Sequence, residues 1–287
     1  MKLCRYDNDR LGVVIDDMVH DISPLQDEIR ASMPYAMKGD AVIAALPTWR
    51  DRMEEAAASA PGVQAADVAL LCPVARPNKV MAAPTNYAAH VAEMGADKTL
   101  THTRTARRGI GEAGIFLKAN SALVGPSEGV PLRFLDRRND HEVELTLIIG
   151  KEGSEISQED ALDYIAGYTI GLDMTLRGGE DRSFRKSIDG YAVMGPWMVT
   201  ADEIPDPDNV PFTISVNGEL RQDAHSSDLI YDIRRLIEFA SSFYTLHPGD
   251  LYMTGSPQGV GPVVPGDMMH AECAQIGAMD VAVRANS

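Results

Sequence analysis

HEVELTLIIG, residues 141–150, is the stretch that best indicates how this chain folds. In a β-strand, Glu142 and Glu144 lie on one face, and the apolar side chains that alternate with them lie on the other. The last four residues, LIIG, are continuously apolar, so the strand is expected to run into a core. Two residues along a strand span about 6.6–6.8 Å, which lets both glutamates reach one ion. Two carboxylates at the edge of a core repel each other and resist the loss of water, and a bound cation removes both problems.

A third carboxylate, Asp173, has a similar setting, because it ends the apolar run YTIGL and precedes a polar turn. Three carboxylates suit a hard ion that prefers oxygen ligands, such as Mg²⁺, Mn²⁺ or Ca²⁺. We therefore predict that Glu142, Glu144 and Asp173 hold a divalent metal ion. Spacing alone leaves a second interpretation open, an exposed strand face with solvated glutamates, because the pattern Glu-x-Glu is common.

The composition is that of an acidic globular protein. The 287 residues are 45% hydrophobic and carry a formal net charge of −16. An acidic surface repels phosphate backbones, so we expect no nucleic-acid partner. No apolar run approaches the roughly 18–20 residues that span a bilayer, and the first residues, MKLCRYDNDR, lack the apolar stretch of a signal peptide. We therefore expect a cytoplasmic protein without a membrane partner.

Cys4, Cys72 and Cys273 are far apart, which favours inert thiols over a disulfide framework or a thiolate zinc site.

The chain is expected to form two domains. The stretch PGVQAADVALLCPVARPNK is rich in turn residues and contains three prolines, which favours a boundary near its end. We predict a small N-terminal domain over residues 1–75, in which no chemistry is indicated, and a larger domain over residues 76–287.

Strand patterns dominate the larger domain, which favours an α+β, mostly β fold. Asn217-Gly218, inside PFTISVNGELRQ, is a strong hairpin signal. The other elements expected are two strands in residues 11–22, a strand in KVMAA, and helices over residues 40–60, 87–94, 158–166 and 229–246. The third of these helices is expected to begin behind a capping box of Ser157 and Asp160.

Seven segments, taken together in a fixed order, indicate a protein family more specifically than any one of them alone. They are NYAAHVAEMG, IFLKANSALVGP, HEVELTLIIGKEG, AGYTIGLDMTLR, Lys186 before GYAVMGPW, VNGELRQ and PGDLYMTGSPQGVG. Together, from about residue 79 to about residue 272, they resemble the fumarylacetoacetate hydrolase family. The resemblance implies a mixed β-sandwich roll, usually a homodimer, with metal ligands at Glu142, Glu144 and Asp173.

The resemblance also implies an enzyme that acts on small 2-oxo acids, like the acylpyruvate hydrolases met in the breakdown of aromatic compounds. The expected reaction is hydrolysis of a carbon–carbon bond in a 1,3-diketo acid of the acylpyruvate or fumarylpyruvate type, with Mg²⁺ or Mn²⁺, or Ca²⁺ as a third candidate, stabilising an enolate. The alternatives within the family are a 2-oxo acid decarboxylase, a sugar-acid dehydratase and a hydroxymuconate-type isomerase. A metabolite-binding protein without catalysis is a third hypothesis, disfavoured because all candidate catalytic residues are present.

Hydrolysis also needs an activated water and a positive charge near the oxyanion. His90 and Glu93 lie at i and i+3 of an expected helix, so they share one face. An isolated pair of this kind is more often a surface pair, but these two match the family's His–Glu pair. Lys186 matches the family's active-site lysine, although by charge alone Arg182 and Arg185 are equal candidates.

Substrate contacts are expected from two further groups of residues. Arg177 is a candidate partner for a substrate carboxylate, or for orienting a metal ligand. The other candidates are Asn86, Tyr87, Thr254, Gly255 and Ser256, and the alternative for each is a structural turn or core contact.

Two regions bear on the choice of substrate. Residues 95–114 are polar, basic and of the length typical of a lid. If this lid closes, one of its cations contacts a second substrate carboxylate, and a solvated loop is the alternative; the cations are Lys98, Arg104, Arg107 and Arg108. In the compact segment RGGEDRSFRK, Glu180 stands where family members often have glutamine. An ionised carboxylate donates no hydrogen bond, which leaves room for a different substrate.

Overall fold

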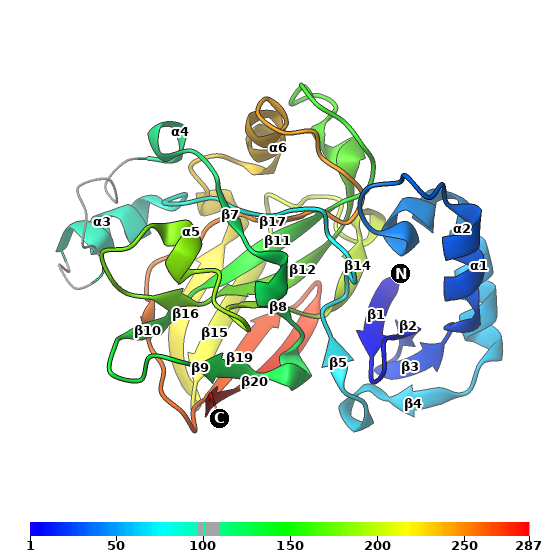
Figure 1. Ribbon diagram of the computed structural model, residues 1–287, viewed down its shortest axis with the longest axis horizontal. Coiled ribbons are helices and arrows are strands. Elements are labelled where there is room, and N and C mark those ends of the chain that lie inside the picture. The colour runs from blue at the N-terminus through cyan, green and yellow to red at the C-terminus, as the bar shows by residue number, and fades with distance from the viewer. Residues whose placement is uncertain (97–99, 101–108, 287) are drawn as a thin grey trace.

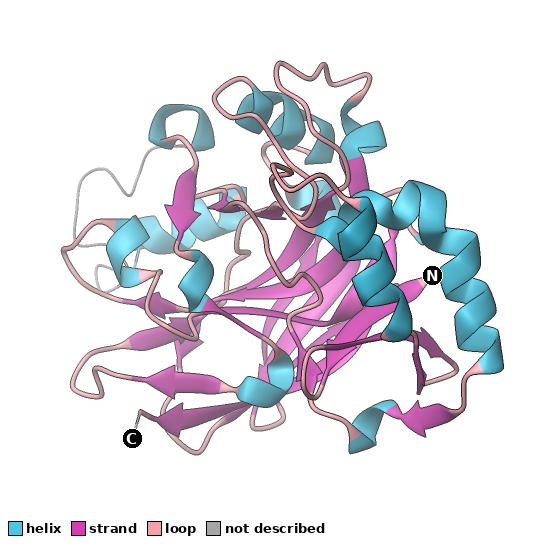
Figure 2. Ribbon diagram, turned by 45° about the vertical axis from the view of Figure 1, so that its right-hand side comes forward, coloured by secondary structure: helices cyan, strands magenta, loops and turns pink. Residues whose placement is uncertain are grey.

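The architecture is described from a computed structural model, which places residues 1–96, 100 and 109–286 (Figure 1). In this part of the chain, twelve strands form one large sheet, five form a second sheet and three form a small third sheet. Helices lie at the periphery of these sheets (Figure 2).

The large sheet has the strand order β4-β3-β2-β1-β14-β12-β11-β17-β6-β7, with β5 beside β1 and β8 beside β14. Its strands are β1 (Lys2–Tyr6), β2 (Arg10–Ile15), β3 (Met18–Asp21), β4 (Gly62–Gln64), β5 (Leu70–Leu71), β6 (Val80–Ala82), β7 (Phe116–Lys118), β8 (Leu123–Val124), β11 (Val143–Ile149), β12 (Ile165–Asp173), β14 (Ala192–Thr200) and β17 (Leu251–Met253). The second sheet contains, in order, β16 (Glu219–His225), β15 (Pro211–Val216), β19 (Met268–Cys273), β20 (Gly277–Ala285) and β9 (Val130–Leu132). The third contains β13 (Thr175–Leu176), β10 (Asn139–His141) and β18 (Gly261–Pro262).

Strand β11 lies inside the large sheet and pairs antiparallel with β12 and β17. All its residues are buried. Leu145 and Leu147 pack into a core that also contains Ile214 of β15 and Met269 of β19, so this core joins the large sheet to the second sheet. Ile148 packs into another core on the opposite face. The predicted alternation, the run into a core and the mostly β sandwich fold are therefore confirmed.

The N-terminal residues extend the large sheet, because Leu3 of β1 pairs with Met198 of β14. Helices α1 (Pro24–Ser32) and α2 (Ala41–Ser59) contact each other beside these strands (Figure 1). Ile29 and Ile43 pack from them into the core that contains Ile148. The strands and the helix predicted for this region are confirmed. The boundary after residue 75 stays a prediction, since one sheet continues across it.

The remaining α-helices of the described residues are α3 (Ala88–Ala96), α4 (Ile110–Ala113), α5 (Arg182–Arg185) and α6 (Ile233–Ser241). Short 3-10 helices occur at Ala65–Asp67, Asn120–Ala122, Pro126–Glu128, Ala161–Tyr164, Ala201–Glu203 and Ser226–Asp228. Among the helices placed by the structure, none is long and apolar enough to cross a membrane. The hairpin signal is confirmed: Asn217 and Gly218 join β15 to β16 with φ of 52° and 80°, as a tight hairpin turn requires.

The helix predicted over residues 158–166 is wrong. Ser157 Oγ donates to Asp160 Oδ2 at 2.8 Å and accepts from the Asp160 amide at 3.2 Å, so the predicted pair does close a turn. The chain then forms only a 3-10 turn, because Ile165 already pairs with Ile149 of β11 at the start of β12. Pairing within the sheet overrides the local helix signal.

The helix predicted over residues 229–246 is too long, since α6 covers only Ile233–Ser241. The Ile230 amide donates to the Asn86 carbonyl at 2.8 Å, and the Tyr231 amide donates to Asn86 Oδ1 at 2.8 Å. These bonds hold the preceding residues outside the helix. Asp232 begins it by accepting from the Arg235 amide at 2.8 Å.

Candidate metal centre and active site

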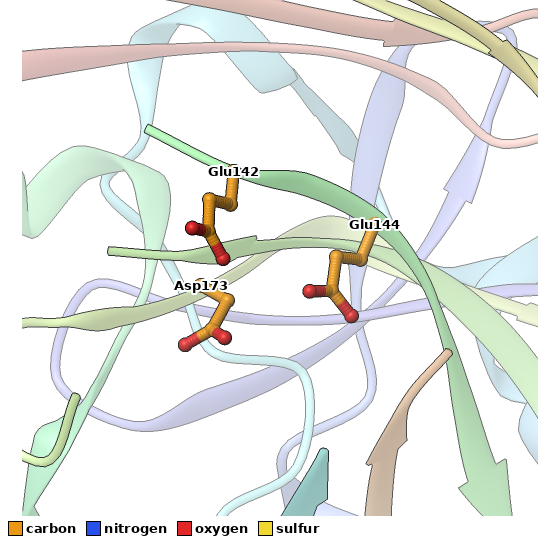
Figure 3. Close-up of side chains that lie close together, drawn as sticks. All are labelled: Glu142, Glu144 and Asp173. Atoms are coloured by element: carbon orange, nitrogen blue, oxygen red, sulfur yellow. The ribbon is translucent and has the colours of Figure 1, made fainter. Parts of the chain in front are cut away.

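Three buried carboxylates meet where β10, β11 and β12 come together. Glu142 lies between β10 and β11, Glu144 lies in β11, and Asp173 ends β12. The Asp173 amide donates to the Glu142 carbonyl at 2.8 Å, which fixes the two strand ends side by side. One carboxylate oxygen of each residue lies within 4.8 Å of the others. Figure 3 shows the three carboxylates pointing into one common space. The sequence prediction that these residues converge is confirmed.

Basic side chains compensate part of this negative charge. Lys186 Nζ donates to Glu142 Oε2 at 2.6 Å and to Asp173 Oδ2 at 2.5 Å. Arg177 donates from Nε to Asp140 Oδ2 at 2.7 Å and from a terminal nitrogen to Glu142 Oε1 at 2.8 Å. Of the two roles predicted for Arg177, the geometry therefore favours orienting Glu142.

Sequence reasoning missed Lys118 and Asp140. Lys118, the last residue of β7, is fully buried and donates to Asp173 Oδ1. Asp140 is also fully buried and accepts from Arg177 and Arg138. The signal for Lys118 was its place in IFLKANSALVGP, a segment of the family pattern. Asp140 stands two residues before Glu142, so it continues the alternation of carboxylates along the chain.

The pKa shifts of the two glutamates go in opposite directions. Burial, together with the neighbouring Asp173 and Glu142, raises the pKa of Glu144 well above its usual value. Burial acts the same way on Glu142, but Lys186 and Arg177 outweigh it and lower the pKa of that carboxyl. The negative charge of Glu144 is compensated least among the three carboxylates. Its only hydrogen bond among the described residues is from the Gly255 amide at 2.6 Å.

These residues fit a hard divalent cation. The donor set is three buried carboxylates, and Glu144 Oε1 makes no hydrogen bond with the described residues although it lies among other carboxylates. A cation shared by the three would remove the repulsion that raises the pKa of Glu144. Glu142, Glu144 and Asp173 are therefore the residues that would hold the ion.

A His–Glu pair faces the same space from helix α3. His90 Nδ1 lies 2.8 Å from Glu93 Oε2, and Glu93 Oε1 accepts from the Gly259 amide at 3.0 Å. His90 is 5% exposed and lines the same cavity as the three carboxylates. Glu93 thus fixes the orientation of the imidazole, and the other ring nitrogen, Nε2, is left for contact with a ligand or a water.

The cavity is small, with a volume of about 60 Å³. Besides the triad and His90, its polar lining includes Arg177, Arg182, Arg185, Lys186 and Ser256. Its chemistry is therefore suited to a small anionic molecule that also reaches a metal ion. The cation-rich wall is notable in so acidic a chain.

Of the residues predicted to bind substrate, Arg177 and Ser256 line the cavity. Ser256 Oγ accepts from Gln222 Nε2 at 3.2 Å, and Gln222 is itself buried. Gly255 acts on a metal-ligand candidate, because its amide donates to Glu144.

The other three predicted contacts have structural partners or surroundings. Asn86 Nδ2 donates to the carbonyls of Tyr231 and Thr254, and Thr254 Oγ1 donates to the Leu145 carbonyl at 2.9 Å. Tyr87 is 2% exposed and packs in the core shared by the two large sheets. Burial raises its pKa. A substrate role for these three stays a prediction, and their contacts are those of the structural alternative.

The cations predicted to act in a lid, Lys98, Arg104, Arg107 and Arg108, lie outside the described residues. Glu180, in contrast, is placed clearly. Its two carboxylate oxygens accept from Arg137 at 2.9 and 2.8 Å, and this hydrogen-bonded guanidinium holds the pKa of Glu180 below its usual value. Glu180 is not among the described residues that line the cavity.

Glu180→Gln is therefore expected to change kcat/KM by less than about threefold, because an exposed ion pair contributes little. Steady-state kinetics on the substrate of the wild-type enzyme would measure the effect. A change of tenfold or more would place Glu180 in substrate binding instead.

Comparisons with known proteins point to one family. Residues 79–284 match the family model described as fumarylacetoacetate (FAA) hydrolase C-terminal. A maleylpyruvate hydrolase of Aquipseudomonas alcaligenes is 50% identical over 99% of both chains. The mitochondrial oxaloacetate tautomerase Fahd2a of Rattus norvegicus is 34% identical, over 78% of this chain and 72% of its own.

Two solved structures are similar to this chain in sequence and in fold. The maleylpyruvate hydrolase from Sphingobium sp. SYK-6, in complex with manganese(II) ion and pyruvate, is 37% identical with a TM-score of 0.84, over the whole of both chains. A 5-carboxymethyl-2-hydroxymuconate delta-isomerase from Mycobacterium smegmatis is 29% identical with a TM-score of 0.71, over 99% of this chain and all of its own.

Proposed function

Because this chain belongs to the fumarylacetoacetate hydrolase family, we propose that it is a metal-dependent hydrolase that cleaves a carbon–carbon bond in a 1,3-diketo acid of the acylpyruvate type. The single observation that carries the proposal is the meeting of two groups in one cavity: the triad of Glu142, Glu144 and Asp173, and the oriented His90–Glu93 pair. The relative with 50% identity is a maleylpyruvate hydrolase, which supports a substrate that is itself an acylpyruvate.

Each group has a task in such a reaction. A divalent ion, when bound, supplies Lewis acidity for the oxygen atoms of a 2-oxo acid. His90, oriented by Glu93, takes a proton from the attacking water through Nε2. Water adds to the acyl carbonyl carbon, the bond from that carbon to the pyruvate methylene breaks, and the methylene carbon gains a proton. The products are a carboxylate and pyruvate.

The positive charges near the triad have a second task. Attack by water places negative charge on the acyl carbonyl oxygen, and a preorganised cation stabilises it. Lys186 is our candidate, since its Nζ already lies within hydrogen-bond distance of two triad carboxylates. Arg177 keeps Glu142 in place while this occurs.

Turnover of acetylpyruvate and fumarylpyruvate in H₂¹⁸O tests the proposal. We expect one ¹⁸O atom in the released carboxylate, loss of activity after chelation with EDTA, and recovery with Mn²⁺ or Mg²⁺. The absence of turnover, or turnover that does not depend on a divalent ion, would contradict the proposal.

A second candidate is a tautomerase or isomerase of 2-oxo acids, favoured by the oxaloacetate tautomerase among the relatives. Such an enzyme uses the same triad and needs no hydrolytic water. It would convert oxaloacetate between its keto and enol forms without adding ¹⁸O to a carboxylate, so turnover of oxaloacetate in H₂¹⁸O separates the two candidates. A decarboxylase or dehydratase would likewise release a product without that label.

Several finer points belong to the same proposal. We propose Mg²⁺ or Mn²⁺ as the physiological ion; the solved relative with manganese supports the second. A homodimer and a cytoplasmic location stay predictions from the sequence, and so does the assignment of each catalytic residue.

A further inference from the structure

Arg182 differs from the other cations that line the cavity. Lys186 and Arg177 bind carboxylates, and Arg185 donates from Nε to the Glu180 carbonyl and from a terminal nitrogen to the Leu176 carbonyl, both at 3.2 Å. No hydrogen bond or ion pair of the described residues involves the Arg182 guanidinium, although it lines the cavity. An arginine at a cavity wall whose guanidinium has neither an anionic partner nor a hydrogen bond within the described residues is a candidate for binding an anionic ligand.

Two neighbours place Arg182 close to the metal-ligand candidates. Its guanidinium carbon lies 5.8 Å from the centre of the Phe116 ring, and Lys186 Nζ lies 5.4 Å from the same ring centre. Arg182 and Lys186 therefore share one aromatic neighbour, and Lys186 contacts Glu142 and Asp173. Arg182 and the three carboxylates also line the same cavity, so one small molecule can contact both.

The local backbone holds Arg182 in that position. Helix α5 begins behind Asp181, whose Oδ1 accepts from the Ser183 amide at 2.8 Å. The Lys186 amide donates to the Arg182 carbonyl at 3.0 Å. The two cations are thus fixed one helical turn apart, with Lys186 at the triad. Burial lowers the pKa of Arg182, which indicates that its charge lacks full compensation.

We infer that Arg182 binds a second carboxylate, at the far end of the substrate, and so selects acylpyruvates whose acyl group itself ends in a carboxylate. This inference rests on the proposed function, in which the 2-oxo acid end lies at the triad. A guanidinium forms two parallel hydrogen bonds with a carboxylate, and water excluded from a cavity strengthens them. Arg182 is thus a specificity-determining residue rather than part of the bond-breaking machinery.

A matched pair of substrates tests the inference. Fumarylpyruvate ends in a carboxylate, and crotonylpyruvate has a methyl group in its place. Arg182→Gln is expected to lower kcat/KM for fumarylpyruvate by about 10- to 100-fold, the range of a charge-assisted hydrogen bond. The same variant should change kcat/KM for crotonylpyruvate by less than about threefold, and Arg182→Lys should fall between. Arg52→Gln, which removes an exposed arginine of α2 that pairs with Glu28, is the control and should alter neither.

Equal losses with both substrates would overturn the inference, because Arg182 would then act on the shared 2-oxo acid end or on the fold. No loss with either would also overturn it. If the wild-type enzyme hydrolyses neither compound, the proposed function fails. The role of Arg182 in binding a second carboxylate can then be tested by measuring ligand affinity alone. Calorimetry in Mn²⁺ should then show that Arg182→Gln weakens 2-oxoadipate about 10-fold or more and leaves 2-oxohexanoate unchanged; an equal effect on the two would overturn the inference.

Discussion

Glu144→Gln is expected to lower kcat/KM by about 1000-fold or more, and to weaken Mn²⁺ binding by at least about 10-fold, because it removes the charge of one of the three carboxylates that would hold the ion. The metal-free variant should nevertheless unfold at the same temperature as the wild type or at a higher one. Burial and the neighbouring carboxylates raise the pKa of Glu144, so a neutral side chain relieves repulsion there. Glutamine also keeps an oxygen that can accept from the Gly255 amide.

Calorimetric Mn²⁺ titration, steady-state kinetics and thermal unfolding of the metal-free protein check these three effects together. Glu180→Gln is the matched control, since it makes the same chemical change at an exposed carboxylate outside the cavity lining. Wild-type turnover by Glu144→Gln would remove this residue from the ligand set. A large drop in the unfolding temperature of the metal-free variant would instead mean that Glu144 mainly holds the fold.

The acidic triad could be predicted because its signal is local. Glu142 and Glu144 alternate with apolar residues at the start of β11, and Asp173 ends another buried strand, so each carboxylate lies at a core edge by its own sequence context. Their convergence needs only that β11 and β12 be neighbours, as they are. The family pattern then added His90, Glu93 and Lys186, and the structure places all three near the triad.

The burial of Lys118 could not be predicted in this way. It is a single lysine at the end of a three-residue strand, and its environment is set by β6 and by Asp173, 55 residues away. The same dependence on distant parts of the chain explains why the helix predicted over residues 158–166 is wrong. The local pattern there is helical, but the pairing of Ile165 with Ile149 depends on a strand from another part of the chain.

His90→Ala is expected to lower kcat for hydrolysis by about 10²- to 10⁴-fold, the usual contribution of a general base. The affinity for Mn²⁺ should change by less than about threefold, because His90 is not among the three carboxylates that would hold the ion. Rapid-quench or steady-state kinetics with acetylpyruvate, together with Mn²⁺ titration, separates the two quantities. Hydrolysis by His90→Ala at the wild-type rate would exclude the proposed role of the pair.

Glu93→Gln tests the pair in a second way, because Glu93 uses one carboxylate oxygen for His90 Nδ1 and the other for the Gly259 amide. Glutamine has a single side-chain oxygen, so it can accept one of these two hydrogen bonds and loses the other, together with the negative charge. We therefore expect a loss in kcat of about 10-fold, smaller than that of His90→Ala, because the imidazole is still present but is oriented less firmly. An unchanged kcat in Glu93→Gln would mean that Glu93 only holds α3 against Gly259 and does not orient the base.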